Sequence, residues 1–348
     1  MRFARAIVRP FVTTQGVARW MLLIGALITS VFLICALFAP WLAPYGFDQF
    51  RSSDGKDFPQ LGHPSSQHWF GTTDLKTDVL SRTIWGARTA LEVVTLAVFM
   101  SLIIGLVLGI ASGYFGGRLD RMLVLVMDAL FAFPSFLLAI VVAFLLTNKI
   151  GSGVFFMTSG VVAAALSLTV IYIPQYFRVV RNTTVSAKEA NYIEAARALG
   201  ATDGVIMRRY LFGNVIQSIP VLGTLNAADA IGTLAGLGFL GIGIQPDQAA
   251  EWGYDLQKSL DEASAGVWWT SLYPALAIIL LITGLTLVGE GLNETINPLL
   301  RTRRLIPVRM TPRETVMSTT LEPALHDDPM ADLQAEDRAR RERRDPNP

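Results

Sequence analysis

Six long apolar runs constrain the fold of this chain more than any other feature. They cover residues 21 to 40, 89 to 114, 122 to 146, 154 to 173, 215 to 244 and 272 to 288. Crossing a hydrocarbon layer of about 30 Å takes about 20 helical residues, because each residue advances the helix by about 1.5 Å. In lipid, the polar backbone groups must pair within the segment, which a helix achieves. The sequence therefore predicts an all-α, polytopic membrane protein with six transmembrane helices.

The polar segments between these runs divide the chain into five parts. We expect a cytoplasmic N-terminus (1–19), a first transmembrane helix (20–43), an extracytoplasmic loop (44–88), a core of five further helices (89–300) and a disordered cytoplasmic tail (301–348). Trp20 and Trp41 bracket the first run as interfacial residues do, and this run is too long for the apolar part of a signal peptide. The tail carries ten arginines and nine acids with few aromatic residues, a composition typical of disorder.

The lysines and arginines predict the orientation. Of the 29 in the chain, 22 lie in the two termini, in the turn over residues 115–121 and in the polar segment over residues 174–213. Cytoplasmic loops of membrane proteins are enriched in these residues. We therefore expect a multi-pass protein of the plasma (inner) membrane with both termini in the cytoplasm. The formal net charge of +1 gives no indication of a nucleic-acid partner.

The polar segment between the fourth and fifth runs is predicted to form two helices joined by a turn. Residues 186 to 199 are rich in good helix formers, and Gly200 can end that helix in a left-handed conformation. Thr202 can cap a second helix that begins near Asp203 and ends at Gly213. With the orientation above, this helix-turn-helix lies in the cytoplasm.

The same segment carries a motif. Glu194-Ala195-Ala196, three residues and then Gly200 resemble the EAA loop of bacterial ABC-transporter permeases. In that family the loop forms coupling helices that sit in a cleft of the cytosolic ATPase. The chain departs from the family pattern further on, where Tyr210, Phe212 and Gly213 stand at the positions of the usual Ile, Leu and Pro. The alternative for these residues is an ordinary amphipathic connector.

The resemblance implies an ATPase-coupling site within residues 186–213. Its candidate residues are Glu194, Ala195, Ala196, Arg197, Gly200 and Asp203. The two alanines are small enough to let another protein's groove approach the backbone closely.

Four other blocks extend the resemblance to residues 20–301. They are the outer loop over 70–88, the run over 128–135, the Gly-rich run over 238–246 and the end of the last apolar run. Together they resemble the C-type permease subunit of dipeptide, oligopeptide or nickel importers, which implies the type I importer fold. Where many relatives carry a glutamate, this chain has Leu234.

The resemblance also implies partners. These are a second permease subunit of the B type, two ATP-binding cassette subunits that hold ATP and Mg²⁺, and an extracytoplasmic substrate-binding protein. The chain itself has no Gly-x-x-x-x-Gly-Lys-Ser/Thr sequence, so we expect no cofactor in it and no enzyme activity of its own.

Three polar residues within the apolar runs are candidates for the pathway. Asn226 and Asp229 are three residues apart and therefore share a helix face that lipid would not tolerate. Glu92 is near the outer end of its run, where it either lines a water-filled path or reaches the interface.

Other functions have less support. The histidines and aspartates of the outer loop do not show a metal-ligand spacing, and the chain has no nucleophile-base constellation for a membrane enzyme. A secondary transporter driven by an ion gradient would show paired inverted repeats, which the sequence lacks. The substrate is left open between peptides, nickel and another small solute.

Overall fold

The computed structural model describes residues 16–147, 158–217 and 219–296, all within one compact unit that spans residues 1–301. The described residues are helical, with loops and two isolated β-bridges between Arg51 and Asp57 and between Thr72 and Asp78. The predicted disordered tail (301–348) and most of the predicted N-terminal segment lie outside these ranges. The all-α class predicted from the sequence is confirmed for the described part.

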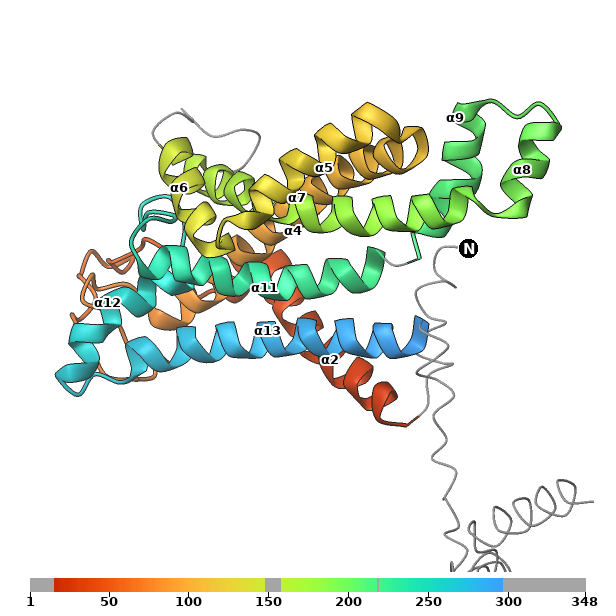
Figure 1. Ribbon diagram of the computed structural model, residues 1–348. Helices are drawn as coiled ribbons and strands as arrows, with labels where there is room; N and C mark the ends of the chain where they lie inside the picture. Colours follow the sequence, from red (N-terminus) through yellow and green to blue (C-terminus); the bar gives the residue numbers. More distant parts are fainter. Residues whose placement is uncertain (1–15, 148–157, 218, 297–348) are drawn as a thin grey trace, which may run out of the picture. The chain divides into compact units, whose positions relative to one another are not determined.

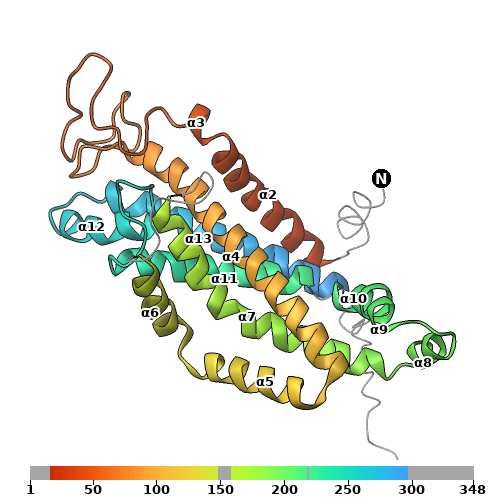
Figure 2. The same cartoon turned by 90° about the horizontal axis from the view of Figure 1, so that it is seen from above.

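Thirteen consecutive elements make up the described chain. They are α2 (Val17–Leu37), α3 (Ala39–Leu42), α4 (Val79–Phe115), α5 (Gly117–Ala132), α6 (Ser135–Thr147), α7 (Ser159–Lys188), α8 (Asn191–Ala198), α9 (Asp203–Val205), a π-helical segment η1 (Ile206–Leu211), α10 (Phe212–Val215), α11 (Ile219–Phe239), α12 (Trp252–Ser264) and α13 (Trp269–Ile296). Figures 1 and 2 place α12 at one end of the helical bundle and α8 with α9 at the other.

Among the described residues, four helices are long and apolar enough to cross a membrane, namely α2, α4, α7 and α13. The pair α5 and α6 makes a fifth if it is counted as one span, although the two helices meet at 96°. Helix α11 corresponds to the run predicted over 215–244 and has 21 residues, but its polar residues and glycines keep it out of this group. The number of six spans therefore stays a prediction.

The break between α5 and α6 falls at Phe133 and Pro134, within the apolar run predicted as one transmembrane helix over 122–146. Proline removes a backbone donor, and its ring clashes with the preceding turn. Pro134 therefore divides this run, and the 96° angle between the two helices turns α6 away from α5 (Figure 2).

Two helices extend beyond the apolar runs from which they were predicted. Helix α4 begins at Val79, ten residues before the expected start, where the Asp78 carboxylate accepts a hydrogen bond from Ser81 N at 2.8 Å. Helix α7 continues through Pro174 to Lys188. The first part of the polar segment over residues 174–213 is therefore the end of this helix, which stops before Glu189. Hydropathy locates the part of a helix that lies in lipid, and a helix continues past that point wherever its backbone can be capped or packed.

A stripe of glycines joins α4 to α7. A Cβ atom on Gly105 would lie 2.5 Å from Tyr176 Cβ, and one on Gly109 would lie 2.7 Å from Val180 Cγ1. Gly113 approaches Thr184 in the same way, at 2.8 Å from its Cβ. Small residues at intervals of four let two helix backbones approach closely.

Candidate functional site

Residues Lys188–Phe212, called the coupling loop here, project from one end of the bundle (Figure 1). The helix predicted over 186–199 is divided in two, because α7 ends at Lys188 and α8 begins at Asn191. Ala190 stands at the N-cap of α8 in an extended conformation and offers no side-chain acceptor. The chain therefore turns sharply between the membrane helix and α8.

The coupling loop has a small apolar core of its own. Ile193 from α8 and Ile206 and Leu211 from η1 are fully buried, and they pack together with Tyr114 near the end of α4. This cluster is separate from the main core of the bundle. Burial of an aliphatic side chain contributes about 1.5–3 kcal/mol, so the cluster gives the loop a defined shape.

Polar contacts attach the loop to the ends of α4 and α7. The Tyr114 hydroxyl donates to Asp203 Oδ1 at 2.5 Å, and the Arg197 guanidinium lies 5.6 Å from the centre of the Tyr114 ring. Lys188 Nζ donates to the Gly113 carbonyl oxygen at 3.1 Å. A displacement of the loop would thus be passed directly to α4.

The six predicted coupling residues are close in space but differ in exposure. Glu194, Ala195 and Arg197 are exposed on α8, whereas Ala196 is buried (6% exposed). Gly200 has φ +82°, with no atom near the position of a Cβ, as expected for a left-handed helix end. Asp203 is exposed and also holds Tyr114.

The second predicted helix of the loop differs from the expectation in form. Thr202 makes no side-chain capping bond, and after the short helix α9 the backbone follows a π-helical path over Ile206–Leu211. Gly213 does not end the helix, since α10 runs through it from Phe212 to Val215. Glycine without a positive φ is tolerated within a helix at a cost of about 1 kcal/mol relative to alanine.

Two of the pathway candidates lie on α11 and contact α7 in different ways. Asn226 is buried beside Tyr176, whereas Asp229 is exposed and accepts a hydrogen bond from the Tyr172 hydroxyl to Oδ2 at 2.8 Å. Asp229 borders a hollow of about 570 Å³ between α6, α11 and α13, of which Asn226 is not a lining residue. The structure therefore places only Asp229 at an open surface.

Glu92 lies in another hollow, between α2 and α4. Its carboxylate accepts from Arg88 Nε at 2.8 Å, one helical turn away. The pair is partly exposed, and both groups belong to the wall of the same hollow. Glu92 is therefore separated from Asp229 and is already paired with a cation.

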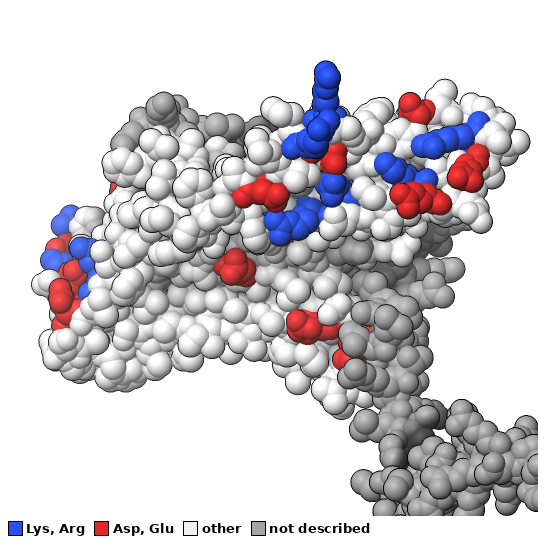
Figure 3. Space-filling view, viewed as in Figure 1, with Lys and Arg blue, Asp and Glu red and all other residues white. Residues whose placement is uncertain are grey.

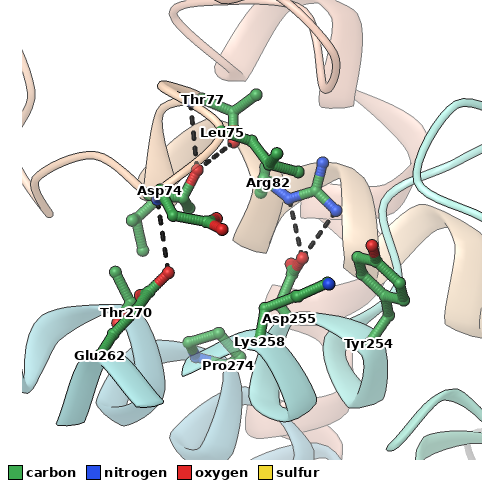
Figure 4. A pocket seen from close by; sticks show the side chains of 12 residues that line it. Asp74, Leu75, Thr77, Arg82, Tyr254, Asp255, Lys258, Glu262, Thr270 and Pro274 are labelled. Carbon is green, nitrogen blue, oxygen red and sulfur yellow. Dashed lines mark hydrogen bonds and ion pairs between the residues drawn. The ribbon is translucent and has the colours of Figure 1, made fainter. Parts of the chain in front are cut away.

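A second polar cluster, called the α12 cluster here, lies at the opposite end of the bundle. It comprises Asp74, Arg82, Glu251, Asp255 and Glu262. Arg82 Nε donates to Asp255 Oδ1 at 2.9 Å, and Asp74 N donates to Glu262 Oε1 at 3.3 Å, which joins α12 to α4 and to the loop before it (Figure 4). These contacts enclose a cavity of about 20 Å³, room for one water molecule.

Glu251 is the most deeply buried acid of this cluster. Its two carboxylate oxygens accept from Gly253 N at 2.9 Å and from Tyr254 N at 2.7 Å, which caps α12. Burial raises the pKa of Glu251 to about 8, against the lowering effect of these two N–H donors. Burial likewise raises the pKa of Glu262.

The outer-loop residues considered for a metal site are dispersed. His68 Nδ1 is 2.9 Å from Asp78 Oδ1, Asp74 lies beside Glu262, and His63 packs on the Trp269 ring. Within residues 16–147, 158–217 and 219–296, no group of three or more His, Cys, Asp and Glu side chains is placed to hold a metal ion. Asp78 and His68 instead fix the start of α4.

Sequence reasoning missed Tyr114, Tyr172 and the whole α12 cluster. Tyr114 and Asp203 are 89 residues apart, and Arg82 and Asp255 are 173 apart, so neither contact has a local pattern. Tyr172 and Tyr176 are one helical turn apart and share a face of α7, which was the available signal for the polar residues opposite them.

Comparison with known proteins gives consistent matches. The family model described as "Binding-protein-dependent transport system inner membrane component" matches residues 105–302. A dipeptide transport system permease protein, DppC of Alkalihalophilus pseudofirmus, is 33% identical over 276 residues, which are 79% of this chain and 85% of that protein. The glutathione transport system permease protein GsiD of Escherichia coli O6:K15:H31 is 34% identical over 282 residues, 80% and 86% of the two chains.

Proposed function

Because the chain belongs to the family of binding-protein-dependent transport system inner membrane components, we propose that it forms, with a second permease subunit, the path by which an ABC importer moves short peptides across the plasma membrane. The relatives' names refer to a dipeptide and to glutathione, both small peptide-like solutes. Neither name supports the nickel alternative. The similarity covers about four fifths of this chain.

The observation that carries the proposal is the construction of the coupling loop. A connector that served only to join α7 to α11 would need neither its own buried core nor a clamp to α4. The outward face of α8 presents Glu194, Ala195 and Arg197, and Leu199 is 89% exposed next to it. An exposed leucine beside small and charged residues suits the groove of a partner protein.

The partner on this loop is a separate ATPase subunit that binds ATP and Mg²⁺, since the chain has no phosphate-binding loop of its own. Closure of two such subunits on ATP would displace the coupling loop. Through Tyr114 and Lys188 the displacement reaches α4 and α7. These two helices should move together, because they pack closely along the glycine stripe of α4. The path would then open to the two sides of the membrane in alternation.

The proposed orientation has both termini and the coupling loop in the cytoplasm, with residues 44–88 outside, where a substrate-binding protein delivers the peptide. It rests on the distribution of lysine and arginine. A cysteine introduced at Ser53 should react with an impermeant reagent in intact cells. Reaction only after the membrane is opened would reverse the orientation.

The coupling proposal is tested with Ala195→Trp in the complete complex. A large side chain at this exposed position should obstruct ATPase docking, so that the ATPase subunits no longer co-purify or no longer drive uptake. Gln217→Trp is the matched control, because Gln217 is also exposed but lies outside the coupling loop. Normal assembly and normal ATP-dependent uptake by Ala195→Trp would contradict docking on this face, and uptake driven by an ion gradient without ATP would favour a secondary transporter.

A further inference from the structure

Asp229 occupies an unusual position for a charged side chain. It is ten residues from each end of α11 (Ile219–Phe239), in a helix whose other side chains are uncharged. An acidic group stands alone over α11 in the middle of a face of mostly uncharged side chains (Figure 3). Ionisable groups at this depth in a membrane are costly and normally face a cavity or a partner.

One oxygen of this carboxylate is held in place. The Tyr172 hydroxyl donates to Oδ2 at 2.8 Å, and Tyr172 itself is fully buried in the main core, so the donor cannot rotate freely. The other oxygen, Oδ1, has no hydrogen-bond partner within the described residues. No lysine, arginine or histidine of that part of the chain forms an ion pair with Asp229.

The hollow beside Asp229 is of suitable size and chemistry for part of a small solute. Its volume is about 570 Å³, and apolar side chains line most of it, including Phe136, Leu225 and Ile282. Among the described residues that line it, the other polar side chains are the hydroxyls of Ser135, Thr233 and Thr286, from three different helices. Small-molecule sites commonly combine an apolar wall with a few convergent polar groups.

A carboxylate with one free oxygen in a largely apolar hollow lacks a cation. A primary ammonium group supplies one charge and three N–H donors, enough for the carboxylate and for nearby hydroxyls. A peptide carries such a group at its N-terminus at neutral pH. We propose that Asp229, positioned by Tyr172, is a subsite that binds the terminal ammonium group of the transported solute; this rests on the function proposed above.

In a transport path, a single fixed carboxylate is more suitable than a closed binding site that surrounds the solute. It attracts every solute with a free amine and makes few contacts with the side chains that differ between peptides. Binding through one charge pair with an open side also permits release when the path opens to the other side of the membrane.

The test uses the complete importer, with both permeases and both ATPases in proteoliposomes and a saturating amount of dialanine-loaded binding protein. Uptake of labelled dialanine and ATP hydrolysis are measured together for Asp229→Asn and Asp229→Glu. We expect Asp229→Asn to lower uptake per ATP hydrolysed at least tenfold, with normal assembly and normal stimulation of ATP hydrolysis. Asp229→Glu keeps the charge and should recover a large part of the uptake.

The control is Asp261→Asn, which removes an exposed carboxylate from α12 and should leave uptake per ATP unchanged. Wild-type uptake per ATP in Asp229→Asn would overturn the subsite. Loss of the second permease from the purified complex would also overturn it, because Asp229 would then bind a basic side chain of that subunit. Absence of ATP-dependent dialanine uptake in the wild-type complex would instead overturn the proposed function.

Discussion

At one end of the bundle the α12 cluster is built into the membrane helices, whereas at the other end the coupling loop folds around its own core and touches them at few points. Beside the α12 cluster, the first residue of α12, Trp252, donates to the Thr83 carbonyl oxygen at 3.1 Å and packs directly on Gly86 of α4. In the coupling loop, α8 is mostly exposed, and the loop reaches α4 chiefly through Tyr114 and Lys188.

The difference shows which end can move as a unit. Groups that interlock with several helices must be separated before they move, so the α12 cluster is expected to be rigid. A loop with its own core keeps its shape when displaced, and its few contacts transmit the displacement to specific points. We therefore expect changes in the α12 cluster to affect stability and changes in the coupling loop to affect transport.

The largest effect should come from Arg82→Ala. Arg82 is almost fully buried, and its loss would leave the Asp255 carboxylate desolvated without a cation. Removing one partner of a buried pair costs about 3–5 kcal/mol. Thermal unfolding of the purified complex should show a marked loss of stability, whereas Arg51→Ala, which removes an exposed partner of Asp57, should show little. Equal stability of the two variants would contradict a rigid α12 cluster.

The second prediction concerns pH. Since burial raises the pKa of Glu251 to about 8, the folded protein binds a proton there that the unfolded chain releases near its ordinary value of 4.5. Stability should therefore fall as the pH rises through this window, by at most about 1.4 kcal/mol per pH unit from this group. Arg82 and Asp255 are the charged groups that face it.

Glu251→Gln should flatten this dependence, although it also removes one of the two acceptors that cap α12. The slope of unfolding temperature against pH separates the two effects, because the lost cap lowers stability equally at every pH. An unchanged slope between pH 5 and 8 would show that Glu251 does not hold its proton in the folded state.

The sequence predicted the features that depend on local chemistry. The helical class and the positive φ of Gly200 both follow from residue type and spacing. These are properties of one segment, or of one helix face, and need no knowledge of the partner segment.

The features that it did not predict depend on contacts between distant segments. Ala195 and Ala196 are chemically alike, and only the burial of Ile193 on the loop's core decides that Ala196 faces inward. Similarly, Asn226 and Asp229 share a spacing, but the positions of α6 and α13 decide that Asp229 alone meets the hollow.

Gly200→Val tests the shape of the coupling loop. A β-branched residue is strongly disfavoured at φ +82°, so the change should destabilise the loop by about 1–3 kcal/mol and misalign α8 with η1. ATPase co-purification should weaken while the unfolding temperature of the membrane helices is retained. Gly204→Ala is the control, because Gly204 also has open space around it and has no positive φ. Equal binding of ATPase by both variants would argue against a role for this turn.

The smallest expected effect is that of Tyr114→Phe, which removes only the hydroxyl that binds Asp203. The ring stays in the apolar cluster with Ile193, so the loop should keep its fold. The free energy that holds the loop against α4 should fall by about 1 kcal/mol, because one hydrogen bond is lost. Amide hydrogen exchange in α8 and η1 should then be about fivefold faster, and less peptide should be taken up per ATP.

Tyr192→Phe provides the comparison, because its hydroxyl accepts a hydrogen bond from Asn214 Nδ2 at 2.9 Å on the exposed side of the same loop. That bond joins α8 to α10 and does not reach α4, so its loss should leave uptake per ATP unchanged. If both variants reduced uptake per ATP to the same extent, the hydrogen bond between Tyr114 and Asp203 would not be specifically required to pass movement of the coupling loop to α4. A reduction confined to Tyr114→Phe would locate the mechanical link between the coupling loop and the membrane helices at this hydroxyl.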